Sequence, residues 1–506
     1  MRKLLLKNSL SGVLQSIVNM ALVFTVIPIF VKMLGQENYG IFSLIIVVGN
    51  LNVFTNLGLT HALIKFLSEQ GKVKESHYDI LITFLLTFII LLPLSLTAAY
   101  LNKFVLISIL NIPQANFEDV RLFYFYLLGS NFLLIIGQVA KAVLDSGQRI
   151  VTTNLIQIIY SFFYWGLILV VLLLGYQLTQ IGIASFFAAI IWFITITYKA
   201  ISYWGRFSLT GLSQNYRRIV KKQLTYGSKI YAGGLIGFFY EPFSKILISH
   251  FIGIAEVGFF DIALRIKNQL WGIISKLFYP LYPLISSIND KVKVRLLVHD
   301  LEQKTFYFVV PIISIVIFTT SPFVNLWLGP NQEMISISVI LITSAFMIGI
   351  TVMPNYQFLI AKGHADKTVI LQLSNVLFNT VIFFITFKWI GYYAAVLANI
   401  SAIMSSFLLS LYYQNKYLQS LIFDSFRQLC KLFFLTSINL TIGYLLSIIL
   451  HSLWLKILLI PFILFMVSFF SFRYLSIFTA EDILRYVGNN NLLKSIGFKV
   501  LLRSNL

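Results

Sequence analysis

Long, nearly unbroken apolar runs alternate with short polar segments along most of this chain. Windows of about 20 apolar residues are long enough to cross a membrane as a helix. Such windows fall at 10–31, 41–64, 79–101, 122–144, 151–174, 179–199, 230–252, 257–286, 305–328, 335–360, 368–388, 392–413, 430–450 and 454–475. The runs do not alternate in polarity, which excludes membrane-spanning strands. The pattern predicts an all-α polytopic membrane protein with about 14 transmembrane helices.

Composition and cysteine content agree with this class. Of 506 residues, 58% are hydrophobic and 11% are charged, more apolar sequence than a soluble core needs. The first run, 10–31, is too long for a signal peptide and lacks a small-residue cleavage site, so we expect it to remain as the first span. The single cysteine, Cys430, excludes an internal disulfide. We expect this cysteine in or near a lipid-facing helix.

Basic residues are distributed unequally between the two sides of the predicted membrane. Most of the 38 Lys and Arg residues fall in segments on the same side as the N-terminus, whereas the opposite loops hold Lys32, Lys103, Arg121, Lys388 and Lys456. The positive-inside rule therefore predicts that both termini are cytoplasmic. Topology and attraction to anionic lipid explain the net charge of +20, so we expect the lipid bilayer and no nucleic acid as a partner.

The connecting segments predict the domain organisation. A basic linker at 205–229 separates an N-terminal six-helix half, 1–204, from a C-terminal six-helix half, 230–414. Two additional transmembrane helices follow at 415–475, and an amphipathic cytoplasmic tail at 476–506. No loop is large enough to house a catalytic domain or an ATPase. We therefore expect no enzyme activity and no cofactor.

A short self-match relates the two halves. Leu34-Gly35 followed by Tyr39-Gly40 matches Ile252-Gly253 followed by Val257-Gly258 at a constant offset, and each segment joins the first two helices of its half. Glycines at matched helix ends predict the same tight external turn twice. Two six-helix repeats of this kind are a known transporter plan, with the substrate cavity between the halves.

Motifs in both halves are similar to those of a known family. Residues 34–40 read Leu-Gly-Gln-Glu-Asn-Tyr-Gly, and residues 56–59 read Asn-Leu-Gly-Leu. Residues 257–265 read Val-Gly-Phe-Phe-Asp-Ile-Ala-Leu-Arg, and residues 279–283 read Tyr-Pro-Leu-Tyr-Pro. This ordered set, over roughly residues 5–415, resembles the polysaccharide transporter family of the multidrug/oligosaccharidyl-lipid/polysaccharide exporter superfamily. Phe259 and Phe260 depart mildly from it, where the family usually has a tyrosine.

The resemblance implies a fold, an activity and partners. It implies a MATE-like exporter fold in a bacterial inner membrane. It also implies a flippase that moves an undecaprenyl-diphosphate-linked oligosaccharide from the cytoplasmic to the outer leaflet. The glycan would be a repeat unit of O-antigen (and so of lipopolysaccharide), capsule or exopolysaccharide, and the resemblance does not choose among them. Polysaccharide polymerase and chain-length machinery are the protein partners it suggests.

Four bases, Lys245, Arg265, Lys267 and Lys276, fall inside predicted spans. A charge at membrane depth costs several kcal/mol and usually faces a water-filled cavity. At about 100° per residue, Asp261, Arg265, Asn268 and Lys276 share one helix face, from which Arg and Lys could grip a diphosphate. The alternative is that Arg265 only pairs with Asp261, four residues earlier. Lys267 points elsewhere and is expected to snorkel or to pair with a neighbouring helix.

Acidic and amide residues in the spans complete the predicted site. Glu241 lies four residues before Lys245 around a predicted kink at Pro242, so the two either pre-pair or couple transport to protons. Ion-coupling candidates are Glu241, Asp261 and Asp145. Substrate-binding candidates are Arg265, Lys276, Lys245, Asn268, Gln15, Asn19, Asn56 and Gln138. The amides among them would either join helices or bind sugar hydroxyls, and Pro354 and Pro280 with Pro283 are candidate hinges.

Two other functional classes fit less well. Gly35 and Gly40 have the glycine spacing of a P-loop, but Ile41 stands where its lysine must be. The six His residues and one Cys show no metal-ligand spacing. A drug or cation antiporter of the same superfamily would need an acidic cavity, and a membrane glycan polymerase or ligase would need a large external loop. Both remain as alternatives.

Overall fold

Helices make up the regular structure of this chain. The computed structural model describes residues 2–49, 58–205, 212–278, 281–420, 422–423, 425–475 and 477, and every regular element within these ranges is a helix. Eleven of the helices are long and apolar enough to cross a membrane, judged by length and composition. The predicted class is confirmed, and the predicted number of about 14 agrees roughly. The first two predicted spans lie in one helix, and 230–252 is divided between two helices. The predicted span 257–286 is not among the eleven, because the helix at Ile254–Phe278 carries several charged residues, Asp261, Arg265 and Lys267 among them.

The chain divides into two compact units. Unit 1 comprises Met1–Leu277 with Val369–Ser405, and unit 2 comprises Phe278–Thr368 with Ser406–Leu506. The units do not follow chain order. The segment 278–368 belongs to unit 2, whereas the segment 369–405 that follows it packs with the N-terminal helices in unit 1. The division into sequence halves stays a prediction.

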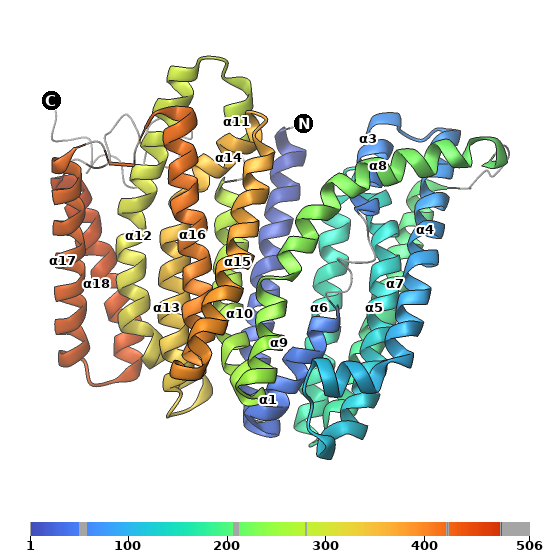
Figure 1. Cartoon of the computed structure of the whole chain (residues 1–506), viewed down its shortest axis with the longest axis horizontal. Coiled ribbons are helices and arrows are strands. Elements are labelled where there is room, and N and C mark those ends of the chain that lie inside the picture. Colours follow the sequence, from blue (N-terminus) through green and yellow to red (C-terminus); the bar gives the residue numbers. More distant parts are fainter. Residues whose placement is uncertain are drawn as a thin grey trace. The chain divides into compact units, whose positions relative to one another are not determined.

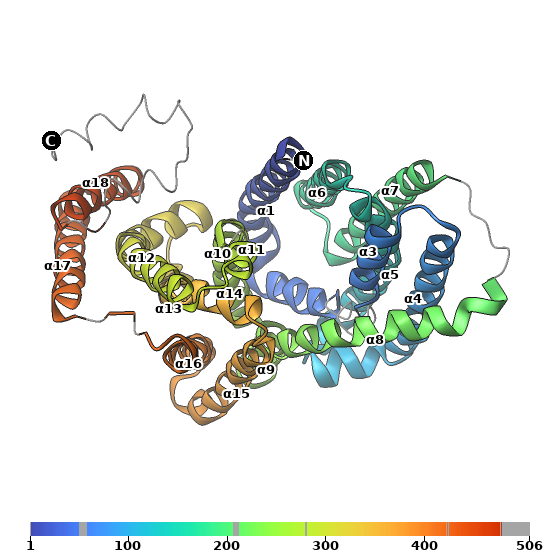
Figure 2. The same ribbon diagram turned by 90° about the horizontal axis from the view of Figure 1, so that it is seen from above.

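Unit 1 is a helical bundle (Figures 1 and 2). Its elements are α1 (Arg2–Gly49), α3 (Leu59–Gln70), α4 (Lys74–Tyr100), a π-helix η1 (Phe104–Ile109), a 3-10 turn η2 (Gln114–Asn116), α5 (Phe117–Ser146), α6 (Ile150–Leu173), α7 (Leu178–Trp204), α8 (Leu212–Phe238), α9 (Glu241–Phe251) and α10 (Ile254–Phe278). Most of α15 (Ala365–Ile390) and the first half of α16 (Tyr393–Leu418) also belong to it. Helices α5 and α7 pack along each other, with Val139 and Trp192 in a shared apolar core.

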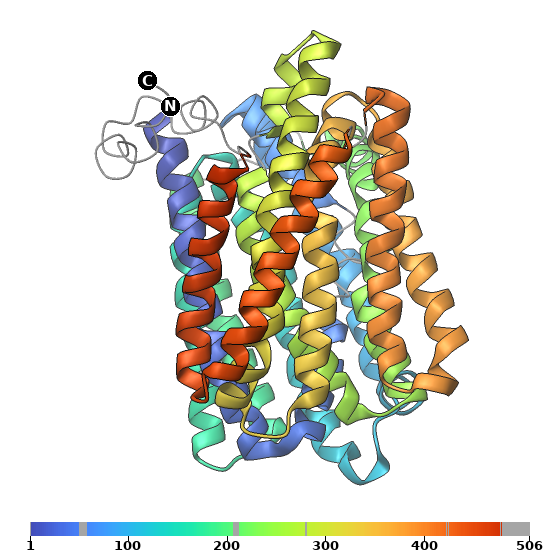
Figure 3. The ribbon, with the colours of Figure 1, turned by 90° about the vertical axis from the view of Figure 1, so that its left-hand side faces the viewer.

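Unit 2 is built on one very long helix, α12 (Lys291–Leu328). The other elements are α11 (Leu281–Ser287), α13 (Glu333–Ile350), α14 (Met353–Ala361), α17 (Phe426–Ile449) and α18 (Leu453–Tyr474), with the ends of α15 and α16. Helices α17 and α18 pack against each other and against α12 (Figure 3). Cys430 is exposed on α17, one of the candidate membrane spans, and its expected place in or near a lipid-facing helix stays a prediction.

Several predicted spans are interrupted near glycine or proline. Gly35 has φ 83° and ψ 166°, a conformation that favours glycine, and it breaks α1 into two segments. Span 230–252 is divided between α8 and α9, with Pro242 in the first turn of α9. Span 335–360 is divided between α13 and α14 just ahead of Pro354. The predicted kink at Pro242 and break at Pro354 are confirmed, whereas Pro280 lies outside the described residues.

The basic segment expected as a linker is largely helical. From Leu212 onward it forms the first half of α8, which packs against α3 and α4 (Figures 1 and 2). Ile219 packs with Tyr78 and Ile82, whereas Arg217, Arg218 and Lys221 are exposed. A count of apolar residues does not detect such an amphipathic pattern. The predicted amphipathic tail lies almost wholly outside the described residues.

The two segments of the internal match pack against each other reciprocally. A Cβ atom added at Gly40 would lie 2.0 Å from the carbonyl oxygen of Ile254, and one added at Gly258 would lie 2.7 Å from Gln36 Nε2. In the match, Gly40 is equivalent to Gly258, and Gln36 to Ile254. The contact of Gly40 with Ile254 and the contact of Gly258 with Gln36 are therefore equivalent positions of the two segments. A two-fold relation between two repeats would produce such a pair of contacts.

Candidate functional site

A buried carboxylate in unit 1 collects three donors from three helices. Asp261 on α10 accepts hydrogen bonds from Tyr39 Oη on α1 at 2.7 Å and from Arg265 Nε at 2.6 Å. Lys245 on α9 forms an ion pair with the same carboxylate at 2.5 Å. The Asp261 side chain is only 4% exposed, so these contacts replace its hydration. The Arg265 guanidinium also lies 5.9 Å from the ring centre of Trp165 on α6.

A second carboxylate on α9 has its partners on α10. Glu241 forms an ion pair with Lys267, whose side chain is 6% exposed. Asn268 Nδ2 donates to the other carboxylate oxygen at 3.1 Å. Glu241 itself is 23% exposed and Asn268 is exposed, so this part of the network is accessible from outside the bundle.

Local helix geometry explains this arrangement and corrects one expectation. The pair Glu241–Lys245 was expected within α9, but each residue reaches across to α10, Glu241 to Lys267 and Lys245 to Asp261. Glu241 and Lys245 both lie in the first half of α9, close to Asp261 and Lys267 of α10. Each of them therefore pairs with a residue of the neighbouring helix instead of pairing with the other. The expected Arg265–Asp261 pair is present, and so is the expected pairing of Lys267 with a neighbouring helix.

Counted over the described residues, the resulting network has more positive than negative charge. Three cations, Lys245, Arg265 and Lys267, face two carboxylates, Asp261 and Glu241. Ion pairs are strengthened in a low-dielectric interior, but the unbalanced charge remains costly to bury. An anion that approaches the network would therefore meet a net positive site with donors already in place.

The opposite face of α9 borders an apolar cavity. Phe243 and Ile246 line it together with Leu94 and Leu101 of the α4 segment and Phe132 of α5, and its volume is about 560 Å³. Because Phe243 and Ile246 lie on the helix face away from Glu241 and Lys245, α9 separates a charged surface from a hydrocarbon-like one. An amphiphilic ligand would find both kinds of surface within unit 1.

Three other predicted substrate-binding residues, all within the described ranges, are not joined to this network. Gln15 and Asn19 lie on α1 and Gln138 on α5, all partly buried. Within the described ranges their amides form no hydrogen bond, so they do not act as helix-joining contacts there. Asn56 lies outside the described residues. Lys276 belongs to α10, but its side chain is also outside what the structure describes.

Asp145 lies at the end of α5, in a local cluster of its own. Lys141 Nζ pairs with it at 2.8 Å, and Thr153 Oγ1 on α6 donates to it at 2.9 Å. These bonds fix the turn between α5 and α6. Asp145 was predicted as an ion-coupling candidate. Its contacts offer a different explanation for the carboxylate, namely that it stabilises this turn.

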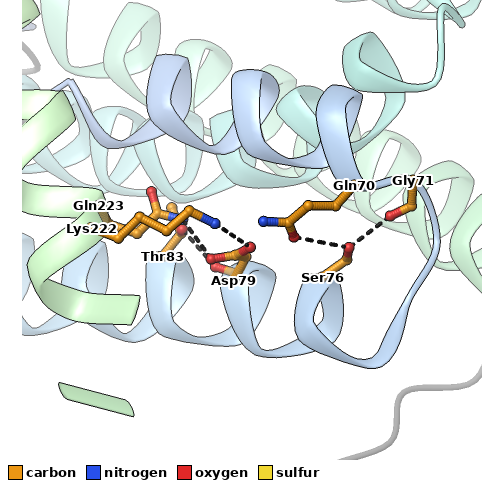
Figure 4. A network of polar contacts seen from close by, with 7 residues as sticks. All are labelled: Gln70, Gly71, Ser76, Asp79, Thr83, Lys222 and Gln223. Carbon is orange, nitrogen blue, oxygen red and sulfur yellow. Dashed lines mark hydrogen bonds and ion pairs between the residues drawn. The ribbon is translucent and has the colours of Figure 1, made fainter. Parts of the chain in front are cut away.

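Sequence reasoning missed Asp79, a buried carboxylate at the start of α4 (Figure 4). Lys222 Nζ and Gln223 Nε2 of α8 lie 3.4 and 3.3 Å from its two oxygens. With its amide turned to satisfy both neighbours, Gln70 of α3 donates to Asp79 and accepts from Lys222. Asp79 therefore joins α3, α4 and α8. Sequence reasoning did not single out Asp79, because it lies at the start of the apolar run 79–101, where a polar residue is common.

A second missed carboxylate lies in unit 2. Glu302 on α12 is fully buried and accepts a hydrogen bond from Gln414 on α16. Asn355 of α14 is also fully buried and donates to Ser410 of α16 at 2.8 Å. Asn355 follows Pro354 inside an apolar run, which is a signal that could have found it. Glu302 lies in the polar stretch 299–304, where nothing in the sequence distinguishes it from its neighbours. Within the described residues, no three His, Cys, Asp or Glu side chains are placed to hold a metal ion.

Comparison with known structures defines the class of fold. The chain is similar to the lipid II flippase MurJ in its inward closed conformation, at 15% identity and a TM-score of 0.72 over 92% of this chain and 99% of that one. It is also similar to an inward-facing multidrug resistance MATE transporter of the MOP superfamily, at 13% identity and a TM-score of 0.64 over 80% and 98%. A variant of the Vibrio cholerae MATE transporter VcmN matches at 13% and 0.56 over 83% and 98%. The fold is therefore that of the MOP exporters.

The family follows from the sequence itself. A family model described as "Polysaccharide biosynthesis protein" matches residues 5–289, more than half of the chain. The chain belongs to this family, as its motifs led us to expect. The search of curated proteins finds no match.

Proposed function

We propose that this protein flips an undecaprenyl-diphosphate-linked oligosaccharide from the cytoplasmic to the outer leaflet of a bacterial inner membrane. The observation that carries the proposal is the network of Lys245, Arg265 and Lys267 on α9 and α10, in which the described cations outnumber the carboxylates. Through Asp261 and Arg265 the network contacts Tyr39 and Trp165, which lie on the candidate membrane spans of α1 and α6. A diphosphate is the anionic part of such a substrate. Family membership and the MurJ-like fold support a lipid-linked glycan as cargo.

In the proposed mechanism, Asp261 acts as an internal counter-ion. It holds Lys245 and Arg265 in place while the site is empty, and the diphosphate displaces it when substrate binds. Arg265 then grips the diphosphate through paired hydrogen bonds and Lys245 acts as a point charge. Displacement also frees Tyr39 from Asp261, so binding changes the contact between α1 and α10. That change gives the site a means of biasing alternating access.

The remaining parts of the substrate have plausible surfaces as well. Gln15, Asn19, Asn56 and Gln138 offer amides to sugar hydroxyls, and the apolar cavity beside α9 offers a hydrocarbon surface to the lipid chain. Both termini are placed in the cytoplasm, following the distribution of basic residues. The driving force is an ion gradient or the substrate gradient, with Glu241, Asp261 and Asp145 as ion-coupling candidates. The protein is a transporter rather than an enzyme.

Deletion of the gene in its host, followed by complementation, tests the proposal. We expect the lipid-linked repeat unit to accumulate on the cytoplasmic leaflet of the deletion strain. Wild type should restore export, whereas Arg265→Ala and Lys276→Ala should reduce it about tenfold or more at equal protein levels, since each removes a charged contact to phosphate. Normal export without the protein would refute the function. Full rescue by both variants would refute only the proposed contacts of Arg265 and Lys276 with phosphate.

A further inference from the structure

A polar pocket in unit 2 lies where three helices end. The first turns of α12, the end of α14 with the loop after it, and the end of α16 enclose a volume of about 510 Å³. All three segments lie on the side that the charge pattern predicts to be cytoplasmic. The pocket does not include any residue of the Asp261 network, which belongs to unit 1.

Three cations line this pocket without a carboxylate beside them. Lys291 and Arg295 stand four residues apart on one face of α12, and Lys362 reaches in from α14. Lys362 Nζ donates to the carbonyl oxygen of Ile288 at 2.6 Å, which fixes the position of its charge. Among the described residues that line the pocket, none is acidic, so its charge is positive and uncompensated.

The acidic residues close by in sequence are engaged elsewhere. Asp290 caps α12 by accepting from the backbone N–H groups of Val292 and Lys293. Asp366 pairs with Lys367 at 2.6 Å. Neither carboxylate lines the pocket. Among the described residues, these two carboxylates therefore do not neutralise the cations that line the pocket.

The far wall is rigid and carries further donors. The rings of His364 and Tyr417 stack with their centres 4.1 Å apart, which holds the imidazole in one orientation. Gln419 follows with φ 50°, in the left-handed region that glycine or asparagine usually occupies at a helix end. Keeping a glutamine there costs backbone energy. Gln419 is one of the residues that line the pocket.

We propose that this pocket binds a phosphate or diphosphate group, with Lys291, Arg295 and Lys362 as its cationic ligands. The guanidinium and ammonium groups match phosphate oxygens, and His364 and Gln419 add neutral donors. The ligand is either the headgroup of an anionic phospholipid or a soluble phosphate ester. Both present the same oxygens to the pocket. The site is separate from the proposed substrate network and does not depend on it.

Lys293 is a control residue that distinguishes binding in the pocket from general attraction by surface charge. Lys293 is exposed on α12 between Lys291 and Arg295, but it lies on the opposite helix face and does not line the pocket. If the basic residues only attract the membrane surface, then all three positions contribute alike. If the pocket binds phosphate, only Lys291 and Arg295 matter.

Calorimetric titration with inorganic pyrophosphate tests the soluble form of the ligand. The full chain, purified in uncharged detergent, carries Arg265→Gln so that binding to the unit 1 network is weakened. We expect added Lys291→Gln with Arg295→Gln to weaken binding about tenfold or more, and Lys293→Gln to change it less than about twofold. The substituted side chains are exposed, and an unchanged Tm confirms that each variant is folded.

Native mass spectrometry tests the lipid form. The same variants are released from nanodiscs of phosphatidylcholine with phosphatidylglycerol, and retained phosphatidylglycerol is counted. Loss in the double variant but not in Lys293→Gln would identify a lipid headgroup as the ligand. Loss of pyrophosphate binding alone would identify a soluble ester. If neither ligand depends on residues 291 and 295 more than on residue 293, the proposal is overturned, whatever the transport assays show.

Discussion

Asp261 is the residue on which the charge balance between α9 and α10 depends. Its two oxygens receive donors from Tyr39, Lys245 and Arg265, so one side chain connects α1, α9 and α10. A buried carboxylate with this many charged donors stabilises them only while it carries its own charge. The proposed function uses the same property, because a diphosphate can replace that charge.

Replacing Asp261 with asparagine tests the balance directly. The amide keeps the shape but leaves Lys245 and Arg265 without a counter-charge in a buried site. We expect Asp261→Asn to lose about 3–5 kcal/mol of stability, measured as a fall in the thermal unfolding temperature in detergent. The additional change Lys245→Met should recover part of the loss. Glu69→Gln is a matched control, because its ion pair with Lys65 is largely exposed and should contribute at most about 1 kcal/mol. Equal unfolding temperatures for Asp261→Asn and Glu69→Gln would contradict this role.

At the residue scale, spacing along one helix predicted some contacts, but it also allowed a pair of Glu241 and Lys245 that the structure replaces with contacts between helices. Spacing alone predicts the pair of Asp261 and Arg265, and it excludes Lys267 from their face. The partner of Lys267 depends on how α9 lies against α10, which helical periodicity does not determine. Asp79 was missed for the same reason, since its partners come from α3 and α8.

At the scale of elements, glycine decides how closely α1 and α10 approach. Gly40 meets the backbone of Ile254, and Gly258 meets Gln36, so both crossings depend on a missing side chain. Backbone cannot move aside as the end of a flexible side chain can. The crossing at Gly40 is therefore the less tolerant of the two.

Adding a methyl group at Gly40 should separate the two helices. The new Cβ would lie 2.0 Å from a carbonyl oxygen, so we expect Gly40→Ala to cost about 1–3 kcal/mol and to lower the unfolding temperature. Gly166→Ala is a suitable control, since Gly166 lies inside α6 with nothing within 4 Å of its Cβ position. That variant should be neutral or slightly stabilising because alanine favours a helix. A Gly40→Ala protein as stable as the control would show that the crossing is looser than described.

Apolar length predicted most helices, and its failures have a common cause. Helices α5, α6 and α7 follow continuous apolar runs and were expected within a few residues. Helix α8 was expected only in part, because its first half is amphipathic and gains its stability by packing on α3 and α4. Breaks near Pro242 and Pro354 were visible because proline restricts the backbone locally.

At the scale of the whole molecule, packing regroups what the chain order separates. Residues 369–405 belong to unit 1 with the N-terminal helices, although the repeat places them in the second half. Sequence patterns show the periodicity within each helix. They do not show which helices bury the most surface against one another. The class of fold was nevertheless predictable, because the motifs around Gly35 and Gly258 resemble those of a known family. The fold agrees with those of MurJ and the MATE transporters.

The most direct test of the account is a flipping measurement on the purified protein. The host's lipid-linked oligosaccharide, labelled on its glycan, is placed in liposomes, and its inner-leaflet fraction is followed with a membrane-impermeant quencher. We predict that wild type transfers the label between leaflets and that Lys245→Gln with Arg265→Gln slows transfer at least about tenfold while remaining folded. Transfer no faster than in protein-free liposomes would contradict the proposed function. Equal transfer by wild type and the double variant would contradict the role of the charged network.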